Sequence, residues 1–231
     1  MAYRAVYYDT ETTGVKFEKD HIIEFAAYDA TLDKSYQTLI NPKRPIPEES
    51  TAIHNITDEM VKDAPTFDQI IPELLEFLDG DVILIAHNND AFDIHFLKTE
   101  FERHNTSFPD WKFVDSLKWA RRYRPDLPRH ALQFLREAYE IEANQAHRAL
   151  DDVMVLHRVF SRMTDDLSIE QVYKLLQEAT QDKMPFGKYQ GKPLKDIPKD
   201  YIEWLNKNGV FEKRENSSLK ESFQKLGVLS C

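Results

Sequence analysis

The sequence contains little sulfur and little glycine. Its 231 residues include one cysteine, Cys231, and six glycines. A single cysteine excludes a disulfide framework, a zinc finger and an iron–sulfur cluster. Any metal ion must therefore be held by oxygen or histidine ligands, which suit hard cations such as Mg²⁺ and Mn²⁺.

Long apolar runs are missing as well. No run approaches the roughly 18 residues that cross a bilayer, and the first nine residues lack the apolar region of a signal peptide. Hydrophobic residues make up 42% and charged residues 30%, a balance that is typical of globular proteins. These features predict a soluble, cytoplasmic protein with no membrane partner.

The net charge of −10 argues against a nucleic-acid partner, because an acidic surface repels phosphates. The charge is unevenly distributed, however. Residues 183–231 hold ten Lys/Arg against six Asp/Glu, and residues 112–136 hold seven against two. Charge alone favours reading both basic segments as solvated surface, and a nucleic-acid partner has to be argued from other features.

The pattern of apolar residues predicts an α/β protein. Stretches rich in β-branched and aromatic residues predict three strands at 3–9, 21–29 and 36–40, and an apolar run predicts a buried strand at Val82–Ala86. Apolar residues at helical spacing predict helices around 67–78, 91–104, 116–123, 130–139 and 148–163. This order of elements indicates a mixed sheet covered by helices.

A change of pattern near residues 164–168 divides the chain. A short helix is expected at about 169–179, and a turn-rich segment with four of the six glycines begins at Met184. The sequence therefore predicts a domain over 1–165, a helical linker over 166–183 and a small C-terminal module over 184–231.

Two carboxylates stand at the end of the first predicted strand. Asp9 and Glu11 flank Thr10, and residues i and i+2 of a strand point to the same face. Their mutual repulsion and desolvation are relieved when a cation lies between them. The ordinary alternative, two solvated carboxylates at a strand-to-turn junction, deserves equal weight for this pair alone.

Two further carboxylates fall on the apolar sides of predicted helices. Asp93 follows the strand Val82–Ala86 and lies beside Phe96 and Leu97, although the helix dipole also favours an acidic residue there. Helical periodicity points Asp152 toward the core stripe and Asp151 to the opposite side.

A histidine precedes the last of these helices. His147 would point outward on a helix, so we place it in the preceding loop, where it could exchange protons. Four inward carboxylates from three segments, with one nearby histidine, match the needs of phosphodiester hydrolysis by two metal ions.

Three ordered motifs in this chain resemble those of the DEDDh 3′–5′ exonucleases. They are Asp9-Thr-Glu11-Thr-Thr-Gly14, His87-Asn88 with Phe92-Asp93, and His147-x-Ala149-x-x-Asp152. Within that family the chain is most similar to the exonuclease X group and to the epsilon proofreading subunits of bacterial DNA polymerase III. The Phe186-Gly-Lys-Tyr-x-Gly-Lys192 segment and the residues around Trp204 also resemble the tail of some exonuclease X-like proteins.

The resemblance implies a ribonuclease H-like fold, with a five-stranded mixed sheet and flanking helices. It also implies roles for individual residues. Two Mg²⁺ or Mn²⁺ ions would be held by Asp9, Glu11, Asp93 and Asp152, and His147 would be the general base. Contacts with the terminal nucleotide would come from the backbone at Thr12, from Val15 as a wedge against the last base, and from His54 and Asn88. One departure, an extra residue between Asn88 and Phe92, leaves Asp90 as a competitor for Asp93.

Three functional hypotheses remain open from the sequence. The leading one is a metal-dependent 3′–5′ exonuclease on DNA 3′ ends, single-stranded or frayed, in repair or proofreading. The same chemistry on RNA, as in ribonuclease T and oligoribonuclease, is the first alternative, and a non-catalytic nucleic-acid-binding or polymerase-binding module is the second. Gln181-Asp-Lys-Met184-Pro-Phe186 also has the spacing of a sliding-clamp peptide, a short motif that often arises by chance.

Overall fold

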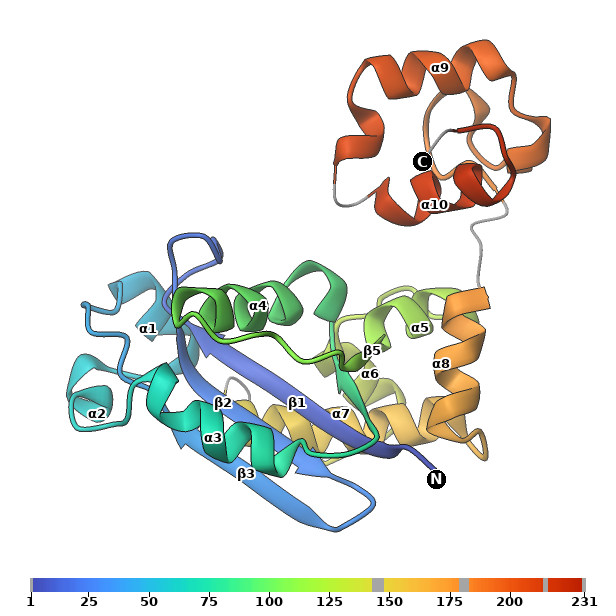
Figure 1. Cartoon of the computed structure of the whole chain (residues 1–231). Coiled ribbons are helices and arrows are strands. Elements are labelled where there is room, and N and C mark those ends of the chain that lie inside the picture. The colour runs from blue at the N-terminus through green and yellow to red at the C-terminus, as the bar shows by residue number, and fades with distance from the viewer. Residues whose placement is uncertain (1, 143–147, 179–182, 214–215, 230–231) are drawn as a thin grey trace. The chain divides into compact units, whose positions relative to one another are not determined.

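Five strands form one mixed sheet in the computed structural model of the chain, in the order β3-β2-β1-β4-β5 (Figure 1). β1, β2 and β3 are antiparallel neighbours, whereas β4 runs parallel to β1 and β5 parallel to β4. The strands are β1 (Arg4–Thr12), β2 (Ile22–Asp29), β3 (Lys34–Leu39), β4 (Val82–Ala86) and β5 (Lys112–Asp115). The expected five-stranded mixed sheet is confirmed, and β5 is the strand that the residue pattern did not show.

The structure describes residues 2–142, 148–178, 183–213 and 216–229. Around the sheet lie α1 (Glu48–His54), α2 (Asp58–Val61), α3 (Phe67–Phe77), the 3₁₀ turn η1 (Asn89–Ala91), α4 (Asp93–Arg103), α5 (Ser116–Tyr123), α6 (Leu132–Ala138), α7 (Ala149–Thr164) and α8 (Ile169–Glu178). Within the described ranges, none of the helices combines the length and the apolar character that crossing a membrane requires.

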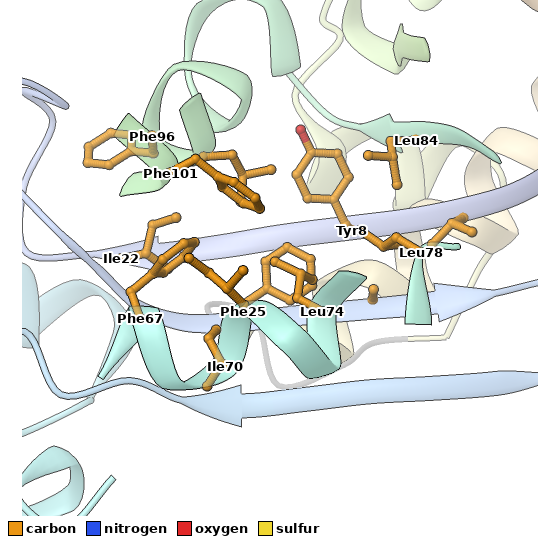
Figure 2. Packing of buried hydrophobic residues seen from close by; sticks show 14 of the residues in the cluster. Tyr8, Ile22, Phe25, Phe67, Ile70, Leu74, Leu78, Leu84, Phe96 and Phe101 are labelled. Atoms are coloured by element: carbon orange, nitrogen blue, oxygen red, sulfur yellow. The ribbon is translucent and has the colours of Figure 1, made fainter. Parts of the chain in front are cut away.

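Helices cover both faces of the sheet, because successive side chains of a strand point to opposite faces. Tyr8 of β1 packs with Phe25 of β2 in a buried cluster that also contains Phe67 of α3 and Phe96 of α4 (Figure 2). Tyr7, the preceding residue, contacts the ring of Phe160 in α7. α3 and α4 therefore cover one face and α7 the other, so the face that carries Tyr7, Asp9 and Glu11 looks toward α7.

The chain divides into two compact units, Met1–Tyr173 and Lys174–Cys231. The division falls within α8, whose first part is attached to the first unit: the backbone N–H of Tyr3 donates to Glu170 Oε1 over 2.7 Å, and Val172 is buried. The predicted domain of residues 1–165 and the linker over 166–183 stay predictions, and the start of that segment packs as part of the first unit.

The second unit has a small core of its own. It contains η2 (Gly187–Tyr189), η3 (Leu194–Asp196), α9 (Lys199–Lys207), η4 (Val210–Glu212) and α10 (Ser217–Lys225). Met184 is buried in the core of this unit and Phe186 packs against it. Gln181 lies outside the described residues. Burial of Met184 argues against an exposed clamp-binding peptide, and we do not propose one.

Candidate active site

β1 extends past the end of its neighbour β4. β4 pairs with Arg4–Tyr7 of β1, whereas the pairing with β2 continues to Thr12. Asp9 and Glu11 therefore lie on a stretch of β1 that has β2 on one side and runs beyond β4 on the other. This leaves room beside the sheet, at the carboxyl ends of its parallel strands, where ligands bind in open α/β sheets.

Asp152 of α7 meets the two carboxylates of β1. One ligand oxygen of each of Asp9, Glu11 and Asp152 lies within 4.8 Å of the others, and Asp152 is 9% exposed. Gln133 of α6 orients it, because the Gln133 Nε2 donates to Asp152 Oδ1 over 3.1 Å. The helical phase that turned Asp152 inward is confirmed, and Asp151 is the more exposed of the two.

Asp93 lies at the start of α4, beside this three-carboxylate group rather than within it. It is buried, and the hydroxyl of Thr10 donates to Asp93 Oδ1 over 2.8 Å. Its charge nevertheless raises the pKa of both Asp9 and Glu11. The competitor Asp90 is exposed and forms an ion pair with Lys118 at 3.2 Å. Asp93 is thus the buried carboxylate of this segment, next to the group.

Burial and mutual repulsion raise the pKa of Asp9, Glu11 and Asp93. Burial, with the charges of Asp93 and Glu11, raises the pKa of Asp9 well above its ordinary value. Burial, with the charges of Glu24 and Asp152, raises the pKa of Glu11 to about 8. Burial raises the pKa of Asp93 to about 7. Oxygen donors that repel one another in this way fit a divalent cation, which would relieve the repulsion.

The metal-free protein should become less stable as the pH rises, and Glu11→Gln should reduce that loss. The pKa of Glu11 rises from 4.5 to about 8 on folding, so the folded state holds more protons between these values. Stability then falls as pH increases through this window. Thermal unfolding in EDTA should give a lower Tm at pH 8 than at pH 5 for the wild type and a flatter profile for the variant. A steeper profile in Glu11→Gln would contradict this account.

A fifth carboxylate, Glu24, is fully buried behind the group and was not singled out from the sequence. It faces Glu11 across the β1–β2 ladder. Its oxygens accept from the backbone N–H of Ala149 at 3.2 Å, from Arg148 Nη2 at 3.3 Å and from Gln37 Nε2 at 2.8 Å. Glu24 therefore ties the start of α7, and with it Asp152, to β2. The sequence did offer one signal for Glu24, since it is an acidic residue inside a largely apolar predicted strand.

Glu24→Gln should lower both stability and turnover. The amide cannot accept from Arg148 and Ala149 as a carboxylate does, and losing hydrogen bonds to a buried charged group costs about 1–3 kcal/mol. We expect a lower Tm. We also expect kcat to fall about tenfold, which corresponds to an increase of about 1.4 kcal/mol in the activation free energy. Gln37→Ala, which removes only the exposed partner, is the control and should change neither by much. Equal effects of the two variants would show that the contacts with Arg148 and Ala149 do not matter.

Asp115, at the end of β5, fixes the turn that precedes Asp93. Its carboxylate accepts from the backbone N–H groups of Asn88 at 3.1 Å and Asp90 at 3.0 Å. It also caps α5 by accepting from Leu117 at 2.9 Å and Lys118 at 3.2 Å. Burial raises the pKa of Asp115. Neither this residue nor its strand was predicted from the sequence.

The residues expected to contact a terminal nucleotide have different surroundings. Val15 is 76% exposed, and Asn88 is exposed in a left-handed turn with φ 69°. The Thr12 hydroxyl donates to the carbonyl of Gly14 over 2.6 Å. His54 is buried, and its Nδ1 accepts from the backbone N–H of Ile56 at 3.0 Å. Val15 and Asn88 are thus accessible, whereas His54 has an internal partner; all four assignments stay predictions.

Glycine is required in the loop that presents Val15. A Cβ on Gly14 would overlap the carboxylate of Asp20. That carboxylate closes the loop by accepting from the backbone N–H of Lys16 over 2.8 Å. Gly14 therefore allows Asp20 to approach the backbone and close the loop, and the Val15 side chain remains exposed to solvent.

His147 lies outside the described residues, so its role as a general base stays a prediction. Arg148, the residue before α7, has extended backbone with φ −126° and ψ 117°. Because Arg148 contacts Glu24, the residue next to His147 is attached to β2.

Comparisons with known proteins agree with this geometry. An exonuclease family model of the RNase T type matches residues 6–160, and a family described as a quorum-sensing-regulated virulence factor matches residues 173–221. DNA polymerase III subunit epsilon of Treponema pallidum is 38% identical over 163 residues, which cover 68% of this chain and 74% of that protein. A PolC-type DNA polymerase III of Caldanaerobacter subterraneus is 31% identical over 191 residues, and there the matched part spans only 13% of the relative.

Solved structures share the fold. Exonuclease X in complex with 5′-overhanging duplex DNA matches with a TM-score of 0.58 and 24% identity, covering 74% of this chain and 99% of that one. The ribonuclease H-like sheet that the motifs implied is thereby confirmed. The family match spans most of the first unit and includes all four candidate carboxylates. The chain belongs to the RNase T-type exonuclease family, and it is a nuclease and a hydrolase.

Proposed function

We propose that this protein is a metal-dependent 3′–5′ exonuclease that removes nucleotides from DNA 3′ ends, in repair or proofreading. The observation that carries the proposal is the meeting of Asp9, Glu11 and Asp152 within 4.8 Å beside the buried Asp93. The relationship to an epsilon subunit supports DNA as the substrate and proofreading or repair as the setting.

The chemistry follows from the donors present. Asp9, Glu11, Asp93 and Asp152 would hold two Mg²⁺ or Mn²⁺ ions. When bound, such ions stabilise the charge that develops on the attacking and leaving oxygens of a phosphodiester. Val15, which is 76% exposed, is available to wedge against the last base, and the backbone at Thr12 to contact the terminal 3′ hydroxyl.

His147 would complete the reaction as general base. It takes a proton from the attacking water, whose oxygen bonds to phosphorus as the bond to the 3′ oxygen breaks. The 3′ oxygen takes up a proton and remains on the shortened strand. A nucleoside 5′-monophosphate is released.

A panel of labelled substrates tests the proposal. Single-stranded DNA, matched duplex, 3′-mismatched duplex and RNA are each labelled at the 3′ end or at the 5′ end and incubated with Mg²⁺, Mn²⁺ or EDTA. We expect a labelled mononucleotide to appear first from 3′-labelled DNA, with either metal and not with EDTA. Release of nucleotides from the 5′ end, or cleavage at internal positions, would show that the proposed 3′–5′ exonuclease polarity is wrong. Cleavage of RNA alone would favour the ribonuclease alternative, and no cleavage of any substrate would favour a binding module.

A further inference from the structure

The second unit carries three neighbouring aromatic rings at the edge of its core, two of them partly buried and one exposed. Trp204 of α9 is 55% exposed, while Ile202 and Leu205 on the same helix are buried. Its ring stacks on that of Tyr201, with an interplanar angle of 15° and centroids 5.8 Å apart. Tyr189 meets the edge of Tyr201 at 4.8 Å. We call Tyr189, Tyr201 and Trp204 the aromatic surface.

Two lysines lie over Tyr189, one of the three rings of the aromatic surface. The ammonium groups of Lys188 and Lys192 are 5.3 Å and 5.4 Å from the centroid of the Tyr189 ring, and both side chains are exposed. Residues 183–231 carry ten Lys/Arg against six Asp/Glu. Sites for single-stranded nucleic acid combine two components, aromatic rings on which bases stack and positive charge that attracts the phosphates. Both are present here.

The aromatic surface is fixed by its contacts with the rest of the second unit. Tyr201 packs against the core of the unit, which limits the freedom of the ring stacked on it. Gly187 begins the turn of Lys188 with φ +74°, and a Cβ there would lie 2.7 Å from the Tyr201 hydroxyl oxygen. The tight turn thus brings the lysines beside the rings. A platform that is ordered in advance loses less entropy when a ligand binds.

We propose that the aromatic surface binds single-stranded nucleic acid, as a contact site separate from the carboxylates of the first unit. A base would stack on Trp204, and Lys188 and Lys192 would neutralise neighbouring phosphates. This rests on the proposed function only in that the substrate is nucleic acid. A protein partner fits less well, because Trp204 and Leu226 are the large exposed apolar residues among those described in this unit. Protein interfaces expose larger continuous apolar patches.

The test measures binding by the full-length protein to fluorescein-labelled oligothymidylate in EDTA, which prevents cleavage. Trp204→Ala should weaken binding about tenfold, as expected for the loss of one base–aromatic stack. Trp204→Phe keeps a ring and should bind nearly as well as the wild type. Leu226→Ala, which truncates an apolar residue that is 48% exposed on the same unit, is the matched control and should have no effect.

The lysines are tested by salt dependence. Replacing both Lys188 and Lys192 by glutamine should make the slope of log affinity against log salt shallower by about 1.4, at about 0.7 for each phosphate contact with a single strand. The double variant Lys213→Gln/Lys225→Gln removes the same charge after η4 and on α10, and should leave the slope unchanged.

Intrinsic fluorescence provides a second measurement that does not depend on Trp204→Ala folding correctly. The chain has three tryptophans, of which Trp119 is buried. Unlabelled oligothymidylate should quench the emission of the wild type and leave that of Trp204→Phe nearly unchanged.

Unchanged affinity in Trp204→Ala, or equal quenching in wild type and Trp204→Phe, would overturn the aromatic surface as a nucleic-acid site and direct attention to a protein partner. Binding through Trp204 without cleavage in Mg²⁺ or Mn²⁺ would instead overturn the proposed function and leave the aromatic surface standing. The two failures are therefore distinguishable.

Discussion

Replacing Asp152 by alanine should lower exonuclease activity by more than about 10³-fold, whereas Asp151→Ala should change it only modestly. Asp152 contributes an oxygen to the three-carboxylate group with Asp9 and Glu11, so its loss would remove a ligand from the proposed metal site. Metal ions supply several kcal/mol of transition-state stabilisation, and about 4 kcal/mol corresponds to about 10³ in rate. Asp151 is a partly exposed charge on another side of the helix, where small effects are usual.

The comparison requires initial rates on 3′-labelled single-stranded DNA with saturating Mg²⁺. The neighbouring variant is a stringent control, because it has the same side chain, the same helix and the same change in charge. Thermal unfolding of both variants shows whether α7 still packs. Equal losses of activity in the two folded proteins would mean that the carboxylate group does not bind the catalytic metal through Asp152.

His147→Ala should slow turnover by about 10²–10⁴-fold while metal binding persists. The expected range is that of a lost general base. The pH profile provides the diagnostic readout, since a limb of kcat that depends on the deprotonated imidazole should disappear in the variant. His157, on α7 and packed against the rings of Tyr7 and Tyr28, is a control of the same residue type.

Titration calorimetry with Mn²⁺ separates the two roles open to His147. If His147→Ala binds Mn²⁺ as tightly as the wild type but turns over slowly, His147 acts as a general base. A collapse of affinity would show that His147 is a ligand and that the assignment of roles is wrong.

Much of the sheet was predictable because its strands have strong local patterns. Val82–Ala86 reads as a buried strand in sequence and is buried at every position in the structure. β5 was missed because Lys112–Asp115 is four residues long and begins and ends with a charged residue. Such a strand is stabilised by pairing with β4 rather than by its own propensity, and pairing between distant segments is not visible in a single sequence.

The site shows the same division between local and distant signals. Helical periodicity predicted that Asp152, and not Asp151, faces the core. The apolar residues beside Asp93 favoured it over Asp90 as the inward carboxylate. Asp115 resembles an ordinary charged residue in the sequence, and the one local signal at Glu24 is its place inside an apolar strand. Their importance comes from backbone N–H groups of other segments, which only the folded chain brings to them. The inward positions of Asp93 and Asp152 were predictable from local patterns, whereas the residues that hold their segments in place were not.

The early end of β4 sets a limit on how far this domain can be stabilised by engineering. β4 has five residues and β1 has nine, so the sheet is incomplete beside Asp9 and Glu11. Extending β4 would add backbone hydrogen bonds, but it would displace the turn that leads to Asp93 and occupy the room beside Asp9 and Glu11. A redesign that extends β4 should therefore raise the Tm and lower the nuclease activity.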